Sequence, residues 1–133
     1  MSVRAVIDTN VLVSSFLSKN PNSPTVRIAR AIANGVFTPV FSKEMLEEYE
    51  EVLGRCHFKF TPSDISILLG KIKEHGMEIA PIDSSEDSPD PDDKVFFCTA
   101  LAGDARLVTG NARHYPKSTI VVSPGEFCKI AAI

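Results

Sequence analysis

Acidic side chains in three separate segments of this sequence have the chemistry to bind a divalent metal ion. Asp8 directly follows a short apolar run, Glu48 lies in an amphipathic segment, and the stretch from Asp90 to Asp93 contains three aspartates. Mg²⁺ and Mn²⁺ prefer oxygen ligands and keep several bound waters, so two or three carboxylates can hold one ion. A bound ion of this kind can activate water and polarise a phosphodiester.

Two of these positions also have ordinary structural explanations. Asp8 could simply cap the helix that follows it, as aspartate often does. Glu48 belongs to a helix rich in glutamates, where a solvated face is the simplest interpretation (Glu44, Glu47, Glu50 and Glu51). However, Glu48 lies at the edge of the apolar stripe, three residues after Met45 and four before Val52. A carboxylate that is half buried there is costly without a cation.

The third position is the acidic stretch, where capping of the next helix explains one acid only. Three acids in four residues repel one another, and a bound cation would relieve that repulsion. Asp93 is the best ligand candidate because its spacing to Phe96 and Ala100 predicts the inward side of the first helical turn, with Asp92 in support.

Polar residues next to Asp8 and after a later strand could support the carboxylates. Thr9 and Asn10 are either turn residues or groups that orient the Asp8 carboxylate. In Leu107-Val108-Thr109-Gly110-Asn111, Thr109 can add a hydroxyl and Asn111 an amide near Asp8, although Gly-Asn alone would be an ordinary turn.

The elements that position these residues follow from apolar periodicity and from capping residues. Buried strands are predicted for residues 3–7, 36–41, 77–82, 106–109 and 119–122. Helices are predicted for residues 11–17, from Ser23-Pro24 to Asn34-Gly35, after Ser42, from Thr61-Pro62 to Gly76, around 95–100, and from the capping box at Ser123 and Glu126. Residues 83–92 contain no strongly apolar side chain and are predicted to form an exposed loop.

This alternation of strands and helices predicts a three-layer α/β/α sandwich with a central parallel sheet of about five strands. Ligands of such sheets bind beyond the carboxyl ends of the strands, where strand order reverses. Asp8 and Asn111 both fall at strand ends of this kind.

The composition is that of an ordinary globular domain of 133 residues, with 44% hydrophobic and 23% charged residues. A net charge of −3 argues weakly against binding nucleic acid through an electropositive surface alone. No apolar run is long enough to span a membrane and no secretion signal is visible, so we expect a cytoplasmic protein. Cys56, Cys98 and Cys128 are predicted to be buried, reduced thiols, and the histidines lack zinc-ligand spacing.

Taken together, the segments resemble the PIN-domain family, and more closely its toxin components of toxin–antitoxin systems. Four segments carry the resemblance: Val-Ile-Asp-Thr-Asn-Val-Leu-Val-Ser around Asp8, Leu46-Glu47-Glu48-Tyr49, Asp-Pro-Asp-Asp-Lys-Val-Phe-Phe-Cys-Thr-Ala from Asp90, and Leu-Val-Thr-Gly-Asn-Ala-Arg-His-Tyr-Pro from Leu107. Each segment is weak alone, but their order and spacing cover nearly the whole chain.

The resemblance implies a single PIN-like nuclease domain over residues 1–133, with endoribonuclease activity that depends on Mg²⁺ or Mn²⁺. The positions that match the family's metal ligands are Asp8, Glu48 and Asp93, whereas Asn111 replaces a fourth acid. Losing that charge argues against tight binding of a second ion. The resemblance also implies an RNA substrate, an antitoxin partner and a homodimer.

In this interpretation Asp8 and Asp93 are the principal ligands, Glu48 completes the shell or orients water, and Asn111 fixes a water or a phosphate oxygen. Candidate RNA-backbone contacts are Arg55, Lys59, Arg113, His114 and Lys117, each also an ordinary surface residue.

Three alternatives stay open. A haloacid-dehalogenase-like phosphatase would need an acid where Asn10 stands. A receiver domain would need an aspartate after the third strand, where Ile82-Asp83 is a poor match. A PIN-like module that binds protein or RNA without catalysis is compatible with Asn111.

Overall fold

The computed structural model describes residues 3–80 and 94–133. Its centre is a five-stranded, all-parallel sheet with the strand order β3-β2-β1-β4-β5. The strands are β1 (Arg4–Ile7), β2 (Thr38–Phe41), β3 (Met77–Glu78), β4 (Arg106–Val108) and β5 (Val121–Val122). The predicted parallel sheet is therefore confirmed, and its first strand is central.

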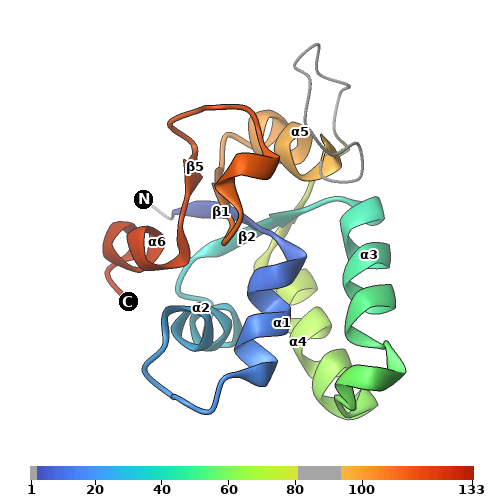
Figure 1. The fold of residues 1–133 in the computed structure, drawn as a ribbon. Helices are drawn as coiled ribbons and strands as arrows, with labels where there is room; N and C mark the ends of the chain where they lie inside the picture. The colour runs from blue at the N-terminus through green and yellow to red at the C-terminus, as the bar shows by residue number, and fades with distance from the viewer. Residues whose placement is uncertain (1–2, 81–93) are drawn as a thin grey trace.

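Six α-helices surround this sheet within the described residues: α1 (Thr9–Leu17), α2 (Pro24–Ala33), α3 (Lys43–Leu53), α4 (Pro62–His75), α5 (Lys94–Ala102) and α6 (Pro124–Ala131). The described residues also include two short 3-10 helices: η1 (Cys56–Phe58) lies between α3 and α4, and η3 (Ala112–His114) lies between β4 and β5. Helix α5 packs against β1, β2 and β4 on one side, whereas α1, α2 and α4 lie together on the other (Figure 1). The arrangement is the predicted α/β/α sandwich.

Helix starts match the capping residues that the sequence offers. The side chains of Ser42 and Thr61 accept hydrogen bonds from the backbone N–H of Met45 (3.3 Å) and Asp64 (3.2 Å). The Ser123 hydroxyl accepts from the backbone of Glu126 (3.1 Å), whose side chain accepts from the backbone of Ser123 (3.0 Å). These bonds satisfy backbone donors that a helix leaves unpaired, so the N-caps predicted at Ser42, Thr61 and Ser123 are confirmed. Ser23 occupies the predicted N-cap position of α2, but its side chain forms no cap hydrogen bond.

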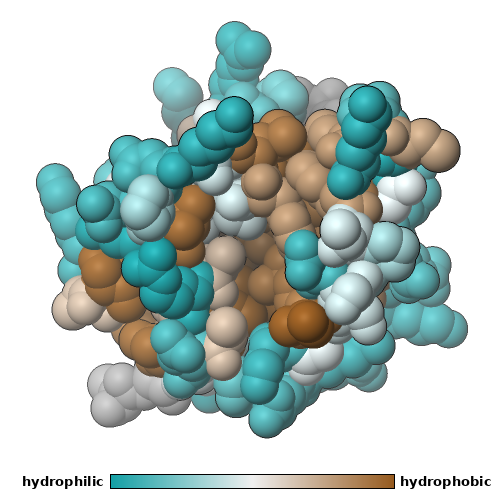
Figure 2. All heavy atoms as spheres, turned by 90° about the horizontal axis from the view of Figure 1, so that it is seen from below, coloured by the Kyte–Doolittle hydropathy of each residue, from teal (hydrophilic) through white to brown (hydrophobic). Residues whose placement is uncertain are grey.

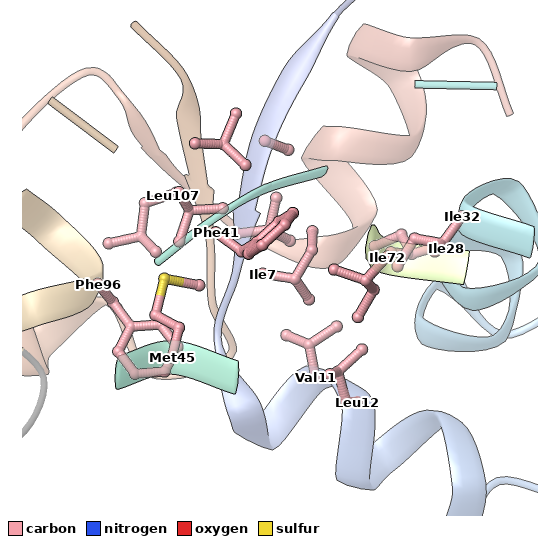
Figure 3. Packing of buried hydrophobic residues seen from close by; sticks show 14 of the residues in the cluster. Ile7, Val11, Leu12, Ile28, Ile32, Phe41, Met45, Ile72, Phe96 and Leu107 are labelled. Atoms are coloured by element: carbon pink, nitrogen blue, oxygen red, sulfur yellow. The ribbon is translucent and has the colours of Figure 1, made fainter. Parts of the chain in front are cut away.

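The hydrophobic core lies on both faces of β1, whose Ala5, Val6 and Ile7 are at most 1% exposed. In Figure 3, Ile7 lies among side chains from α1, α2 and α4 and side chains from α3, α5 and β4 (Val11, Leu12, Ile28, Ile32, Ile72, Met45, Phe96, Leu107). A strand buried on both faces explains the continuous apolar run that precedes Asp8.

The last strand is shorter than the sequence predicted. Residues 119 and 120 precede β5 instead of belonging to it, because the backbone N–H of Val121 donates to Ser118 O (3.2 Å) in a turn. At the other edge, β3 spans two residues, and the predicted strand to residue 82 leaves the described range after residue 80. The predicted loop 83–92 also lies outside the described residues.

One prediction about the cysteines is wrong. Cys98 and Cys128 are buried as expected, but Cys56 is exposed. It lies on η1, beyond the C-cap of α3 at Gly54, and none of the residues of η1 is buried. No helix in the described part of the chain is long and apolar enough to cross a membrane.

Candidate metal site at the carboxyl edge of the sheet

The pairing of β1 with β4 brings Asp8 beside Thr109. Ile7 is in register with Val108, and the backbone N–H of Asp8 donates to Val108 O (2.9 Å), which extends the ladder by one residue. Both residues that follow the paired strand ends are buried, Asp8 at 6% exposure and Thr109 at 1%. The pairing of the two strands thus brings Asp8 and Thr109, which are 101 positions apart in the sequence, into contact at the candidate site.

The Asp8 carboxylate is held by hydroxyl groups and does not cap its helix. Its Oδ2 accepts hydrogen bonds from Thr109 Oγ1 (2.7 Å) and from the Tyr115 hydroxyl (3.0 Å). Asp8 occupies the N-cap position of α1 but forms no side-chain cap hydrogen bond. Simple helix capping therefore does not explain this aspartate.

Thr109 is itself oriented by the loop that follows β4. The backbone N–H of Asn111 donates to Thr109 Oγ1 (3.0 Å). Because that oxygen accepts from the backbone, the threonine hydroxyl proton is left to point at Asp8. Asn111 therefore supports the site through its main chain, and a side-chain role in metal binding stays a prediction.

Glu48 approaches the same place from α3. Its Oε2 accepts a hydrogen bond from the hydroxyl of Thr9, the residue directly after Asp8. Glu48 is half buried, whereas the other glutamates of the helix are exposed (Glu44, Glu47, Glu50 and Glu51). The predicted difference between Glu48 and its neighbours is confirmed, and it follows from the position of Glu48 at the edge of the apolar stripe.

The buried side chain of Tyr49 reports how close the two carboxylates lie. Its hydroxyl donates to Ile7 O, the last residue of β1. Burial raises the pKa of Tyr49 well above its usual value, and the nearby carboxylates of Asp8 and Glu48 raise this pKa further. Both acids are therefore within Coulombic reach of one hydroxyl.

Asn10, two residues after Asp8, has a side-chain oxygen that the described part of the chain leaves unsatisfied. Its Oδ1 is buried and has no hydrogen-bond partner among the described residues. A buried carbonyl oxygen without a donor is costly, and a cation or a bound water would satisfy it. The nearby Gly110 lies after β4, where an added Cβ would be 4.0 Å from Asn10 Oδ1.

These donors fit an oxygen-preferring ion that keeps part of its water shell. Asp8 and Glu48 contribute two carboxylates, while Asp92 and Asp93 lie outside the described residues. Within residues 3–80 and 94–133, no group of three or more His, Cys, Asp or Glu side chains could hold a metal ion. The described part of the candidate site thus contains two carboxylates and neutral oxygens.

The five predicted RNA contacts fall into two groups. Arg113 and His114 lie on η3, directly after Asn111, and Lys117 is exposed two residues after Tyr115. The remaining pair, Arg55 and Lys59, flanks η1 at the far end of α3.

Sequence reasoning missed the roles of two tyrosines. Tyr115 was part of a recognised segment, but its hydrogen bond to Asp8 spans 107 positions. Tyr49 was assigned only to the apolar stripe of α3, although its hydroxyl contacts the end of β1. The available signal was a tyrosine next to each candidate segment, which becomes specific only when the strand order is known.

The comparison with known families agrees with this geometry. The family profile described as PIN domain matches residues 4–113, from the start of β1 into η3. PIN domains are a nuclease-like family whose members generally bind divalent metals. No curated protein and no solved structure matches the chain. Because the profile covers most of the sequence, the chain belongs to the PIN domain family.

Proposed function

We propose that this protein is a Mg²⁺- or Mn²⁺-dependent endoribonuclease that hydrolyses RNA phosphodiester bonds. The observation that carries the proposal is the proximity of Asp8 and Glu48, which come from different elements. Glu48 accepts a hydrogen bond from Thr9, the residue after Asp8, and both carboxylates raise the pKa of Tyr49. Two carboxylates brought together in a partly buried place repel each other, and a divalent cation would relieve this repulsion.

Each residue has a distinct role in this proposal. Asp8 and Glu48 bind the ion directly or through water, and Asp93 joins them as the third acidic ligand. Thr109 and Tyr115 fix the Asp8 carboxylate through their hydroxyls, as Thr9 does for Glu48. Such supporting hydrogen bonds orient metal ligands and tune their basicity.

A bound ion supplies a more acidic water and stabilises the leaving oxygen of an in-line displacement. The chain orients the phosphodiester for that step. In this proposal Asn10 and Asn111 hold a water or a phosphate oxygen. Arg113 and Lys117 contact the RNA backbone, which would position the substrate without reading its sequence.

We further propose that the protein is the toxin of a toxin–antitoxin pair, with an antitoxin partner and a homodimeric state. This part of the proposal is supported by the family resemblance of the four sequence segments. Growth arrest after expression of the active chain, abolished by Asp8→Asn, is the corresponding test.

The activity test is cleavage of mixed single-stranded and structured RNA with and without Mn²⁺. We expect Asp8→Asn and Glu48→Gln each to reduce the cleavage rate by at least ~100-fold, as expected when metal ligation is disturbed. Glu47→Gln is the matched control because this exposed neighbour carries the same charge on the same helix.

Cleavage that is independent of metal, or equally fast in Asp8→Asn, would overturn the proposal. RNA binding without cleavage in the presence of either ion would instead favour the non-catalytic PIN-like module, for which the neutral Asn111 is the motivating feature.

A further inference from the structure

Two hydroxyl groups join helix α3 to the residues on either side of Asp8. The Tyr49 hydroxyl, from α3, donates to the carbonyl oxygen of Ile7, the residue before Asp8. The Thr9 hydroxyl, from the residue after Asp8, donates to the carboxylate of Glu48 on α3. Asp8 and Glu48 are therefore each next in the sequence to a residue whose hydroxyl connects the two elements.

The hydrogen bond of Tyr49 uses no oxygen of either carboxylate. It ends on the main-chain carbonyl of Ile7. The other hydroxyl donors described for the site end on carboxylate oxygens (Thr9, Thr109 and Tyr115). The Tyr49 bond therefore holds the main chain of β1 close to α3 without occupying an oxygen that an ion would bind.

Tyr49 makes this bond in the interior of the protein. Apolar residues that stay uncovered gather in a hollow on the face seen from below (Figure 2), whereas Tyr49 is 2% exposed. Its ring packs edge-on against Phe96 of α5, with the ring centroids 6.1 Å apart. Phe96 and Ile7 belong to the same core cluster (Figure 3). A hydroxyl that is fixed by packing and shielded from water makes a stronger hydrogen bond than an exposed one.

The carboxylates themselves oppose this arrangement. Without an ion, the like charges of Asp8 and Glu48 repel each other, which favours the separation of α3 from the end of β1. A hydrogen bond between the two elements opposes that separation. Ligands that are already held close when the ion arrives bind it more tightly, because less reorganisation is needed.

We propose that Tyr49 is a positioning residue of the metal site. Its hydroxyl holds the peptide bond between Ile7 and Asp8 against α3, and so keeps the Asp8 and Glu48 carboxylates close before the ion binds. This inference rests on the proposed metal-dependent function, to which it adds a residue that contacts neither the ion nor the RNA. Loss of this hydroxyl should weaken metal binding although every ligand stays in place.

The first experiment measures Mn²⁺ binding without RNA in Tyr49→Phe, which removes the hydroxyl and keeps the packed ring. Electron paramagnetic resonance of the free ion gives the affinity. We expect the affinity to fall by about ten-fold, as when a group that supports a metal ligand is lost.

Thr99→Val is the matched control. Thr99 is fully buried and, like Tyr49, donates its hydroxyl to a main-chain carbonyl, that of Val95 (2.7 Å), but both residues of this pair belong to α5. The control should bind Mn²⁺ like the parent protein. Denaturant unfolding of both variants shows whether they lose comparable stability.

The second experiment repeats the Tyr49→Phe change in a Glu48→Gln background, which removes the repulsion between the two acids. If Tyr49 acts by holding these acids together, the same change should now alter the weaker Mn²⁺ affinity by less than about two-fold, since contacting groups that act on each other are not additive. A general loss of structure would instead lower the affinity by the same factor in both backgrounds.

Three results would overturn the proposal: parental Mn²⁺ affinity in folded Tyr49→Phe, an equal loss in Thr99→Val, or the same fold-loss in the Glu48→Gln background. The proposed function fails separately. If Glu48→Gln binds Mn²⁺ as tightly as the parent protein, the metal site itself is wrong, and the role of Tyr49 with it. If Glu48→Gln binds weakly while Tyr49→Phe binds normally, only the role of Tyr49 is wrong.

Discussion

Helices α1 and α6 both have a polar residue at the N-cap position, but the two side chains make different hydrogen bonds. At the start of α6, Ser123 and Glu126 bond reciprocally to each other's backbone, and this exposed box serves the helix alone. At the start of α1, Asp8 has the N-cap position but gives its carboxylate to Thr109 and Tyr115. The comparison indicates that the buried carboxylate of Asp8, which accepts hydrogen bonds from two hydroxyls instead of capping α1, has a role other than helix capping.

Among variants that leave both carboxylates in place, the largest expected effect comes from removing the hydroxyls that hold Asp8. Tyr115→Phe and Thr109→Val each remove one hydroxyl donor, and we expect RNA cleavage to slow by about ten- to a hundred-fold, as when groups supporting metal ligands are lost. Single-turnover cleavage rates and Mn²⁺ titration are the measurements, with Ser123→Ala as the control. Normal rates in both variants would mean that the hydroxyls only stabilise the fold.

A smaller effect, a gain in Mn²⁺ affinity, is expected from replacing the neutral side chain of Asn111 by an acid. Asn111→Asp should tighten Mn²⁺ binding by about five-fold, because an anionic ligand near the ion contributes ~1 kcal/mol even when water screens it at ~4 Å. Titration calorimetry on both proteins measures this. Equal or weaker binding by a folded variant would place Asn111 outside the metal site.

A change at the start of α6 should alter the stability of the fold and leave RNA cleavage unchanged. Ser123→Ala removes the cap, so we expect the free energy of unfolding to fall by ~1 kcal/mol. Cleavage should stay unchanged. Denaturant unfolding provides the measurement, and a loss of activity in folded protein would contradict the separation between the two helix starts.

The smallest effect concerns pH. Hydrogen bonds from the backbone and hydroxyl of Ser123 lower the pKa of Glu126 below its usual 4.5. A lowered pKa in the folded state means that the stabilising contribution is present above pH 4.5 and is lost as pH falls through the lowered pKa. Glu126→Gln should therefore lower stability at neutral pH and match the parent protein in acid, as unfolding curves at several pH values would show. A constant difference across pH would contradict this.

Local signals in the sequence predicted the elements well. Ser42, Thr61 and Ser123 each precede a helix with a suitable cap, and the apolar run before Asp8 indicated a strand buried on both faces. These features depend on neighbouring residues. The start of β5 was harder to predict, because residues 119 and 120 form a turn, closed by the hydrogen bond from Val121 N–H to Ser118 O, instead of the first part of the strand.

The candidate site was only half predictable for a physical reason. Glu48 stood out by its place on a helix face, which one helix determines. Tyr115 did not, because its contact with Asp8 exists only once β4 pairs with β1. The burial of Cys56 was predicted wrongly, because Cys56 lies on η1, a short segment without buried residues.

The two edges of the described sheet have a consequence for self-association. Both β3 and β5 contain only two residues, so the backbone groups they leave open are few. Short edge strands resist the addition of a strand from another molecule, which is the usual start of sheet-mediated aggregation. The edges of the described sheet therefore resist edge-to-edge pairing with a second copy of the chain.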